Sequence, residues 1–97
     1  MATTPEKQLK EECIAGMTEH LAALRTMLHL TQEDLAGLIG VARTTVLYIE
    51  KRTRKMTWNT YLSLAFLFIQ NKETGELLQL FNIYPDRLKK MYSDLNA

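Results

Sequence analysis

A short segment at residues 31–55, with a glycine near its middle, constrains the fold of this chain more than any other feature. Thr31 suits the N-cap of a helix because its hydroxyl can accept a hydrogen bond from an amide of the first turn, and Asp34 completes a pattern similar to a capping box. A helix is therefore predicted to begin at Gln32. Apolar residues recur at helical spacing up to Gly40, which stands where helices commonly end in the left-handed conformation. This helix is predicted to be only about two turns long.

A second short helix is predicted to follow almost at once, over residues 42–51. Val46 and Ile49 fall on one side of it, while polar and aromatic residues fall on the others. Two helices joined by a few residues that include glycine cross at a steep angle, and the small side chain of Ala36 allows them to approach closely. An ordinary helical hairpin inside a bundle would show a similar pattern. The charges around the second helix help to distinguish the two.

Positive charge is concentrated in and just after this second helix. Residues 43–55 carry five cations against one carboxylate, a local net charge of +4 in a chain whose total is +1. The cations are Arg43, Lys51, Arg52, Arg54 and Lys55. Such a concentration in a nearly neutral chain indicates a surface that contacts a nucleic-acid backbone, whereas proteins that coat nucleic acid indiscriminately are usually strongly basic throughout.

The segment resembles the helix-turn-helix of the phage Cro and repressor proteins and of the wider Xre-type regulators. The resemblance covers roughly residues 21–68. The residues that match the family's helix-opening, small, turn, core and acidic positions are Gln32, Ala36, Gly40, Val46, Ile49 and Glu50. The resemblance implies an all-α fold, a lambda-repressor-like helix-turn-helix bundle, here with extra C-terminal helices. One departure is Arg52, because the family commonly has glycine two residues after the glutamate. The exit from the second helix is therefore expected to run on or to bend differently.

The resemblance also implies which residues contact DNA. The second helix would lie in the major groove, which is wide enough for a helix and carries a distinct pattern of donors and acceptors for each base pair. The residues expected to face base edges are Arg43, Thr44, Leu47 and Tyr48. The residues expected to contact phosphates are Gln32, Thr45, Lys51, Arg52, Arg54 and Lys55. Arg25 is expected to pair with Glu50 and so to join the first helix to the third; alternatively, Arg25 is a solvated surface residue.

The rest of the chain is predicted to form further helices around the motif, in a single domain over residues 1–97. An N-terminal extension, about residues 1–17, begins a helix at Pro5 and continues either as one long helix or as two nearly collinear helices broken near Gly16. This extension is either a dimer arm or frayed. A fourth helix, predicted to begin at Thr57, is apolar nearly all round. It must bury a second face against the C-terminal part of the chain or against a second copy.

The C-terminal helical extension, about residues 70–97, is expected to supply core or dimer contacts. Residues 70–72 have the composition of a loop, and a short helix is predicted over residues 77–81. A last helix is predicted to begin at Pro85 or Asp86, because the residue before proline is pushed out of the helical region.

The remaining residues show no pattern of catalysis or of cofactor binding. No glycine-rich phosphate loop, paired carboxylates or nucleophile–base pair is visible, so we predict no enzyme activity and no cofactor. Cys13 is the only cysteine, which excludes an internal disulfide and a cysteine-based zinc site, and His20 and His29 lack metal-ligand spacing.

No stretch approaches the roughly 20 apolar residues needed to cross a membrane. The N-terminus also lacks the order of a secretory signal, so a cytoplasmic protein is expected.

These features predict a transcriptional regulator that binds a specific sequence of double-stranded DNA, acting as a repressor and as a homodimer. One helix-turn-helix unit buries too little surface for strong specific binding, so two half-sites about one helical turn, roughly 34 Å, apart are expected. One alternative is the antitoxin of a toxin–antitoxin pair, which would bind a toxin protein as well as its own promoter. Another is a protein-interaction module whose helix-turn-helix no longer contacts DNA.

Overall fold

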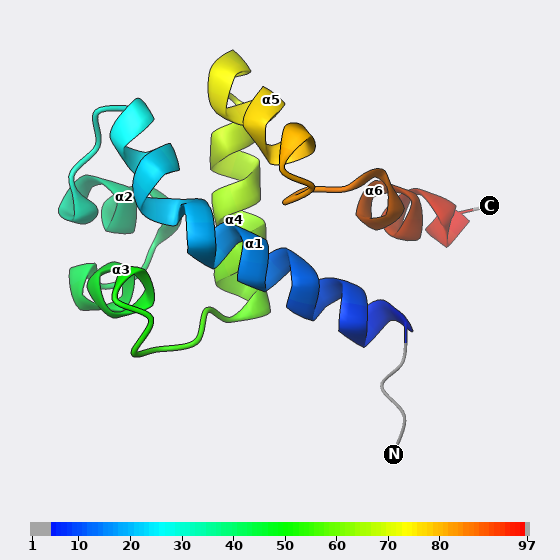
Figure 1. Ribbon diagram of the computed structural model, residues 1–97, viewed down its shortest axis with the longest axis horizontal. Coiled ribbons are helices and arrows are strands. Elements are labelled where there is room, and N and C mark those ends of the chain that lie inside the picture. The colour runs from blue at the N-terminus through cyan, green and yellow to red at the C-terminus, as the bar shows by residue number, and fades with distance from the viewer. Residues whose placement is uncertain (1–4, 97) are drawn as a thin grey trace.

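Residues 5–96 are described by a computed structural model, and every structural statement below refers to them (Figure 1). Within these residues the chain forms six α-helices and a short 3-10 helix, without any strand. The elements are α1 (Pro5–Met27), α2 (Gln32–Ile39), α3 (Arg43–Glu50), α4 (Trp58–Ile69), α5 (Lys72–Leu80), α6 (Asp86–Ser93) and the 3-10 helix η1 (Asp94–Asn96). The predicted all-α fold is confirmed.

The helices are arranged around α4, which α1 crosses in front (Figure 1). The pair formed by α2 and α3 lies on one side of α4, and α5 and α6 lie on the other. α1 spans both groups, because its C-terminal end lies near α2 and its N-terminal half extends towards α6. None of these helices has the length and apolar content needed to cross a membrane.

The core lies where α1 packs against α4. α1 contributes a stripe of buried side chains at helical spacing, namely Leu9, Cys13, Ile14, Met17, Leu21 and Leu24. Tyr61 and Phe68 of α4 are fully buried in the same cluster. The Tyr61 hydroxyl donates a hydrogen bond of 2.7 Å to the backbone carbonyl of Ile83, which ties α4 to the segment between α5 and α6. The Cys13 thiol packs as a small apolar group, and burial raises its pKa.

The N-terminal extension belongs to this core from Pro5 onward. α1 continues unbroken through Gly16, so the structure has one long helix instead of two collinear ones. Leu9 and Cys13 are buried, which rules out fraying of the helix at that point. The predicted start of the helix at Pro5 is confirmed, while residues 1–4 lie outside the described part of the chain.

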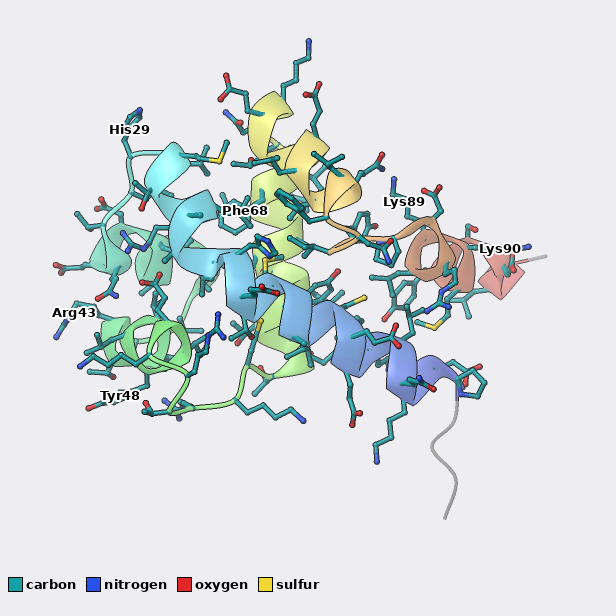
Figure 2. All side chains as sticks on the ribbon, viewed as in Figure 1. His29, Arg43, Tyr48, Phe68, Lys89 and Lys90 are labelled. Atoms are coloured by element: carbon teal, nitrogen blue, oxygen red, sulfur yellow. The ribbon has the colours of Figure 1, made fainter. Side chains whose placement is uncertain are left out.

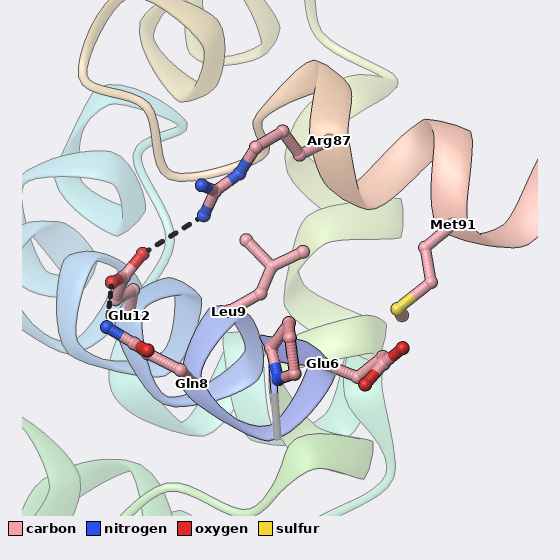
Figure 3. Close-up of a pocket in the computed structure, with 7 residues that line it drawn as sticks. Glu6, Gln8, Leu9, Glu12, Arg87 and Met91 are labelled. Atoms are coloured by element: carbon pink, nitrogen blue, oxygen red, sulfur yellow. Dashed lines mark hydrogen bonds and ion pairs between the residues drawn. The ribbon is translucent and has the colours of Figure 1, made fainter. Parts of the chain in front are cut away.

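An ion pair joins the N-terminal half of α1 to α6. Arg87 Nη2 lies 3.3 Å from Glu12 Oε2, beside an open hollow lined in part by Leu9 and Met91 (Figure 3). The two side chains are 71% and 55% exposed, so water screens their attraction and the pair adds little stability. Leu9 of α1 and Leu88 of α6 are both buried in the core cluster.

The predicted boundaries of α5 are wrong. Residues 70–72 form a shorter loop than expected, because Asn71 is the N-cap and the helix begins at Lys72. The helix predicted over residues 77–81 therefore starts five residues earlier and ends at Leu80.

Polar residues at the joint between α4 and α5 explain this difference. The fully buried Thr74 donates its hydroxyl to the carbonyl of Phe68 at 2.6 Å, so it satisfies the end of α4 from inside α5. Gly75 lies within α5. Glycine is favoured at this position because a Cβ there would lie 3.3 Å from the carbonyl oxygen of Ile69. Thr74 and Gly75, which precede the predicted helix, thus belong to α5 and permit the two helices to meet closely.

The apolar surface of α4 is only partly covered by its own chain. Leu64 is buried and Leu67 is half-buried, whereas Phe66 is 71% exposed.

The last helix, α6, begins at Asp86 with Pro85 as its N-cap. Asp86 is one of the two predicted starts of this helix.

Candidate nucleic-acid interface

The first helix of the motif, α2, begins and ends as predicted. The Thr31 hydroxyl accepts a hydrogen bond of 3.0 Å from the Asp34 amide, and the Asp34 carboxylate accepts one of 3.0 Å from the Thr31 amide. The hydrogen bond from the Thr31 amide lowers the pKa of the Asp34 carboxyl group, and the two bonds together complete a capping box. Gly40 closes the helix in the left-handed conformation, with φ of 78°, and donates its amide to Ala36. The short turn that follows fixes where α3 begins.

The second helix, α3, presents a mostly polar outer side. Val46 and Ile49 are each 2% exposed and hold α3 to the core. Arg43 and Tyr48 project away from the body of the molecule (Figure 2), and Tyr48 is 44% exposed. Leu47 is half-buried beside them. The exposed members of the predicted base-contact set are Arg43, Thr44 and Tyr48.

A partly buried ion pair fixes α3 to α1. Arg25 Nε lies 2.8 Å from Glu50 Oε2 and Arg25 Nη2 lies 3.1 Å from Glu50 Oε1, so the guanidinium binds both carboxylate oxygens. Arg25 Nη1 also donates to the carbonyl of Leu30 at 2.8 Å. The two charged side chains are 18% and 9% exposed, and the hydrogen bond to Glu50 raises the pKa of Arg25. The structure thus brings together the two residues predicted to pair, and Arg25 is not a solvated surface residue.

Gln32 joins this network, which the sequence did not indicate. Its Nε2 donates to Glu50 Oε1 at 2.9 Å, so Glu50 links the start of α2 to α1 and to the end of α3. The amide nitrogen carries two protons, so a phosphate contact is compatible with this bond. The phosphate role of Gln32 stays a prediction. Only the arrangement of the three helices places Gln32 and Glu50 side by side, 18 residues apart in the chain.

The cations that follow α3 lie on the surface. Those of the segment after the helix, Lys51, Arg52, Arg54 and Lys55, are all exposed. Arg54 Nη1 donates to Thr45 Oγ1 at 3.1 Å, which holds the segment against α3. Two members of the predicted phosphate-contact set are thus in direct contact with each other.

Arg52 adopts the backbone conformation that glycine favours. Its φ is 62°, in the left-handed region, and its amide donates to the carbonyl of Ile49 at 2.9 Å. α3 ends at Glu50, with Lys51 as its C-cap, so the first of the two expected outcomes, a helix that runs on, does not occur. The chain makes the turn without glycine and places a cation at the turn instead.

We expect Arg52→Gly to stabilise the fold and to weaken binding to a nucleic acid. Relief of the left-handed strain should raise the free energy of unfolding by about 0.5–1 kcal/mol, measured by urea denaturation. Lys55→Gly is the matched control, because it removes the same charge from a position with no positive φ. Equal stabilisation by both substitutions would show that strain at Arg52 is not the cause.

No group of three or more histidine, cysteine, aspartate or glutamate side chains within residues 5–96 could hold a metal ion. The polar groups of the motif are instead arranged as hydrogen-bond donors and positive charges around α3.

Comparison with protein families agrees with this geometry. Residues 21–57 match the family described as helix-turn-helix. The match covers the C-terminal part of α1, all of α2 and α3, and the cationic segment, and it ends at the N-cap of α4. Comparison with curated proteins and with solved structures gives no significant match.

Proposed function

We propose that this chain binds a specific sequence of double-stranded DNA as a repressor, because residues 21–57 match the helix-turn-helix family, whose Cro/C1-type domains belong to DNA-binding transcription regulators. The observation that carries the proposal is the position of α3. Its outer side exposes Arg43, Thr44 and Tyr48, its inner side is buried, and four exposed cations follow it. A helix held in this way can enter the major groove while the cations lie against the backbone.

The exposed residues of α3 have the chemistry needed to distinguish base pairs. Arg43 can make two hydrogen bonds to the O6 and N7 atoms of guanine, and Thr44 can donate or accept one. Tyr48, with the half-buried Leu47, can contact the methyl group of thymine. We propose that these four residues determine the sequence preference.

The surrounding residues are proposed to position the helix on the duplex. Lys51, Arg52 and Lys55 place charge where phosphates pass, and Arg54 does so while bound to Thr45. At the start of α2, the amides of Gln32 and Glu33, which precede the capped Asp34 amide, are proposed to bind a phosphate next to the Gln32 side chain. These contacts add affinity on any DNA sequence and fix the register of α3.

We propose a repressor because occupancy of a promoter by such a protein blocks transcription. We also propose that it acts in the cytoplasm. A single α3 reads only a few base pairs, so we propose that two copies bind together on half-sites about 34 Å apart. The chain as a whole is proposed to be one domain, with the residues outside the helix-turn-helix supporting this arrangement.

Replacement of Arg43 by alanine tests the base-reading role. We expect binding to a duplex selected by the wild-type protein from a random pool to weaken by about 1–3 kcal/mol, with loss of preference at one base pair in each half-site. Titration against duplexes that vary one base pair at a time measures both effects. Lys51→Ala is the control, because loss of a phosphate contact weakens binding to all duplexes alike. If Arg43→Ala behaves in the same way, Arg43 is a phosphate contact.

A further inference from the structure

The cationic segment after α3, residues 51–55, lies beside the part of α1 that precedes the matched residues 21–57 (Figure 1). A hollow of about 530 Å³ lies between the two. Arg52, Arg54 and Lys55 line it from the segment, and Glu11 and Glu19 line it from α1. All five side chains are exposed. Charges of opposite sign therefore face each other across one open space.

The two carboxylates belong to one row along α1. Glu11, Ala15 and Glu19 follow one another at intervals of four residues, so they lie on the same face of the helix. All three line the hollow. Within residues 5–96 neither Glu11 nor Glu19 forms an ion pair with a cation. Their charges are therefore not cancelled by direct pairing, and they act across the hollow.

The size of the hollow decides whether these charges affect a bound phosphate. A space of 530 Å³ is about 8 Å across, which is less than the Debye length of about 10 Å at 0.1 M salt. Salt therefore screens the carboxylates only in part at this range. A phosphate held by Arg52, Arg54 or Lys55 comes within a similar distance of the carboxylates, and like charges repel each other.

We propose that Glu11 and Glu19 oppose the binding of DNA phosphates to the cationic segment, and so limit the affinity of the protein for DNA of any sequence. The inference rests on the proposed function and assigns a role to the part of α1 that precedes the matched residues. Arg43, Thr44 and Tyr48 do not line the hollow, so base reading by α3 is unaffected. When affinity for all sequences is limited, only a duplex that adds base contacts is occupied at low protein concentration.

The test is the double substitution Glu11→Gln and Glu19→Gln, which removes two charges and keeps the size of both side chains. Affinity for the selected duplex and for a shuffled duplex of the same composition is expected to rise equally. The gain should be about 10-fold at 50 mM salt and about threefold at 200 mM, because salt screens the repulsion. Fluorescence anisotropy with labelled duplexes measures both.

The matched control is the double substitution Glu73→Gln and Glu76→Gln. It removes the same charge from exposed positions of α5, on the other side of α4 from α3. Affinity for either duplex is expected to change less than about twofold, because these carboxylates lie far from the cationic segment. Circular dichroism checks that all variants are folded, which the exposure of the four glutamates favours.

Ala15→Glu tests the proposal in the opposite direction, because it adds a third carboxylate to the same row. Binding to both duplexes is expected to weaken about threefold at 50 mM salt. Equal gains from the two double substitutions would overturn the proposal, since net charge alone would explain them. An unchanged affinity after Glu11→Gln and Glu19→Gln, or tighter binding by Ala15→Glu, would overturn it as well. Equal affinity of the wild type for the selected and shuffled duplexes would instead refute the proposed function, and the effect of the carboxylates would still be measured on either duplex.

Discussion

Glu50→Ala is expected to destabilise the protein by about 3 kcal/mol, the lower end of the range for breaking a poorly solvated ion pair. The carboxylate accepts two hydrogen bonds from Arg25 and one from Gln32, and it joins the helices α1, α2 and α3. Without it, the Arg25 guanidinium keeps only its bond to the carbonyl of Leu30 and remains largely shielded from water. Thermal unfolding of a chain of this size should shift downward by roughly 12–24 °C.

Glu12→Ala provides the control for this prediction. Glu12 forms the other arginine–glutamate pair between helices, with Arg87, but both partners are more than half exposed. Its loss is expected to cost less than about 1 kcal/mol. Equal destabilisation by the two substitutions would mean that the Arg25–Glu50 pair is not a structural link, and that burial of Val46 and Ile49 alone fixes α3.

The affinity for duplex DNA is expected to fall by about 10⁴ when monovalent salt rises from 50 to 200 mM. The four exposed cations after α3 give eight in a pair of chains, and each phosphate neutralised contributes about −0.9 to the slope of log affinity against log salt. The predicted slope is therefore about −7. Fluorescence anisotropy with a labelled duplex measures it over this range.

Removal of half of these charges tests the assignment. The double substitution Lys51→Ala and Lys55→Ala should reduce the slope to about −4, because two cations remain in each chain. It leaves the Arg54–Thr45 hydrogen bond and the turn at Arg52 in place. A slope that is flat in the wild type would instead favour a protein-interaction module that does not contact DNA.

The local features of the helix-turn-helix could be predicted because short-range chemistry determines them. The Thr31 cap, the left-handed Gly40 and the buried Val46 and Ile49 each follow from neighbours a few residues away. The exposure of Arg43 and Tyr48 follows from the same helical period. The concentration of positive charge after α3 could also be predicted without knowledge of the fold.

Features that depend on packing between distant segments could not be predicted in the same way. The short helix was predicted to begin only at residue 77, after Thr74 and Gly75, since only the arrival of α5 at the end of α4 explains a buried hydroxyl and a missing side chain at these two positions. The bond from Gln32 to Glu50 likewise depends on how α2 and α3 cross. Arg52 is a different case. Glycine, the residue that favours the left-handed conformation, is absent at this position, yet the chain still makes the turn.

The most direct test of the claim that α3 reads base sequence is a binding titration on two duplexes of equal length and composition. One is selected by the wild-type protein from a random pool, and the other is a shuffled version. At about 150 mM salt the selected duplex is expected to bind at least about 10³ more tightly, because base contacts add to the shared phosphate contacts. Equal affinity for both duplexes, even with a steep dependence on salt, would contradict the account: the cations would then bind DNA without any reading by α3.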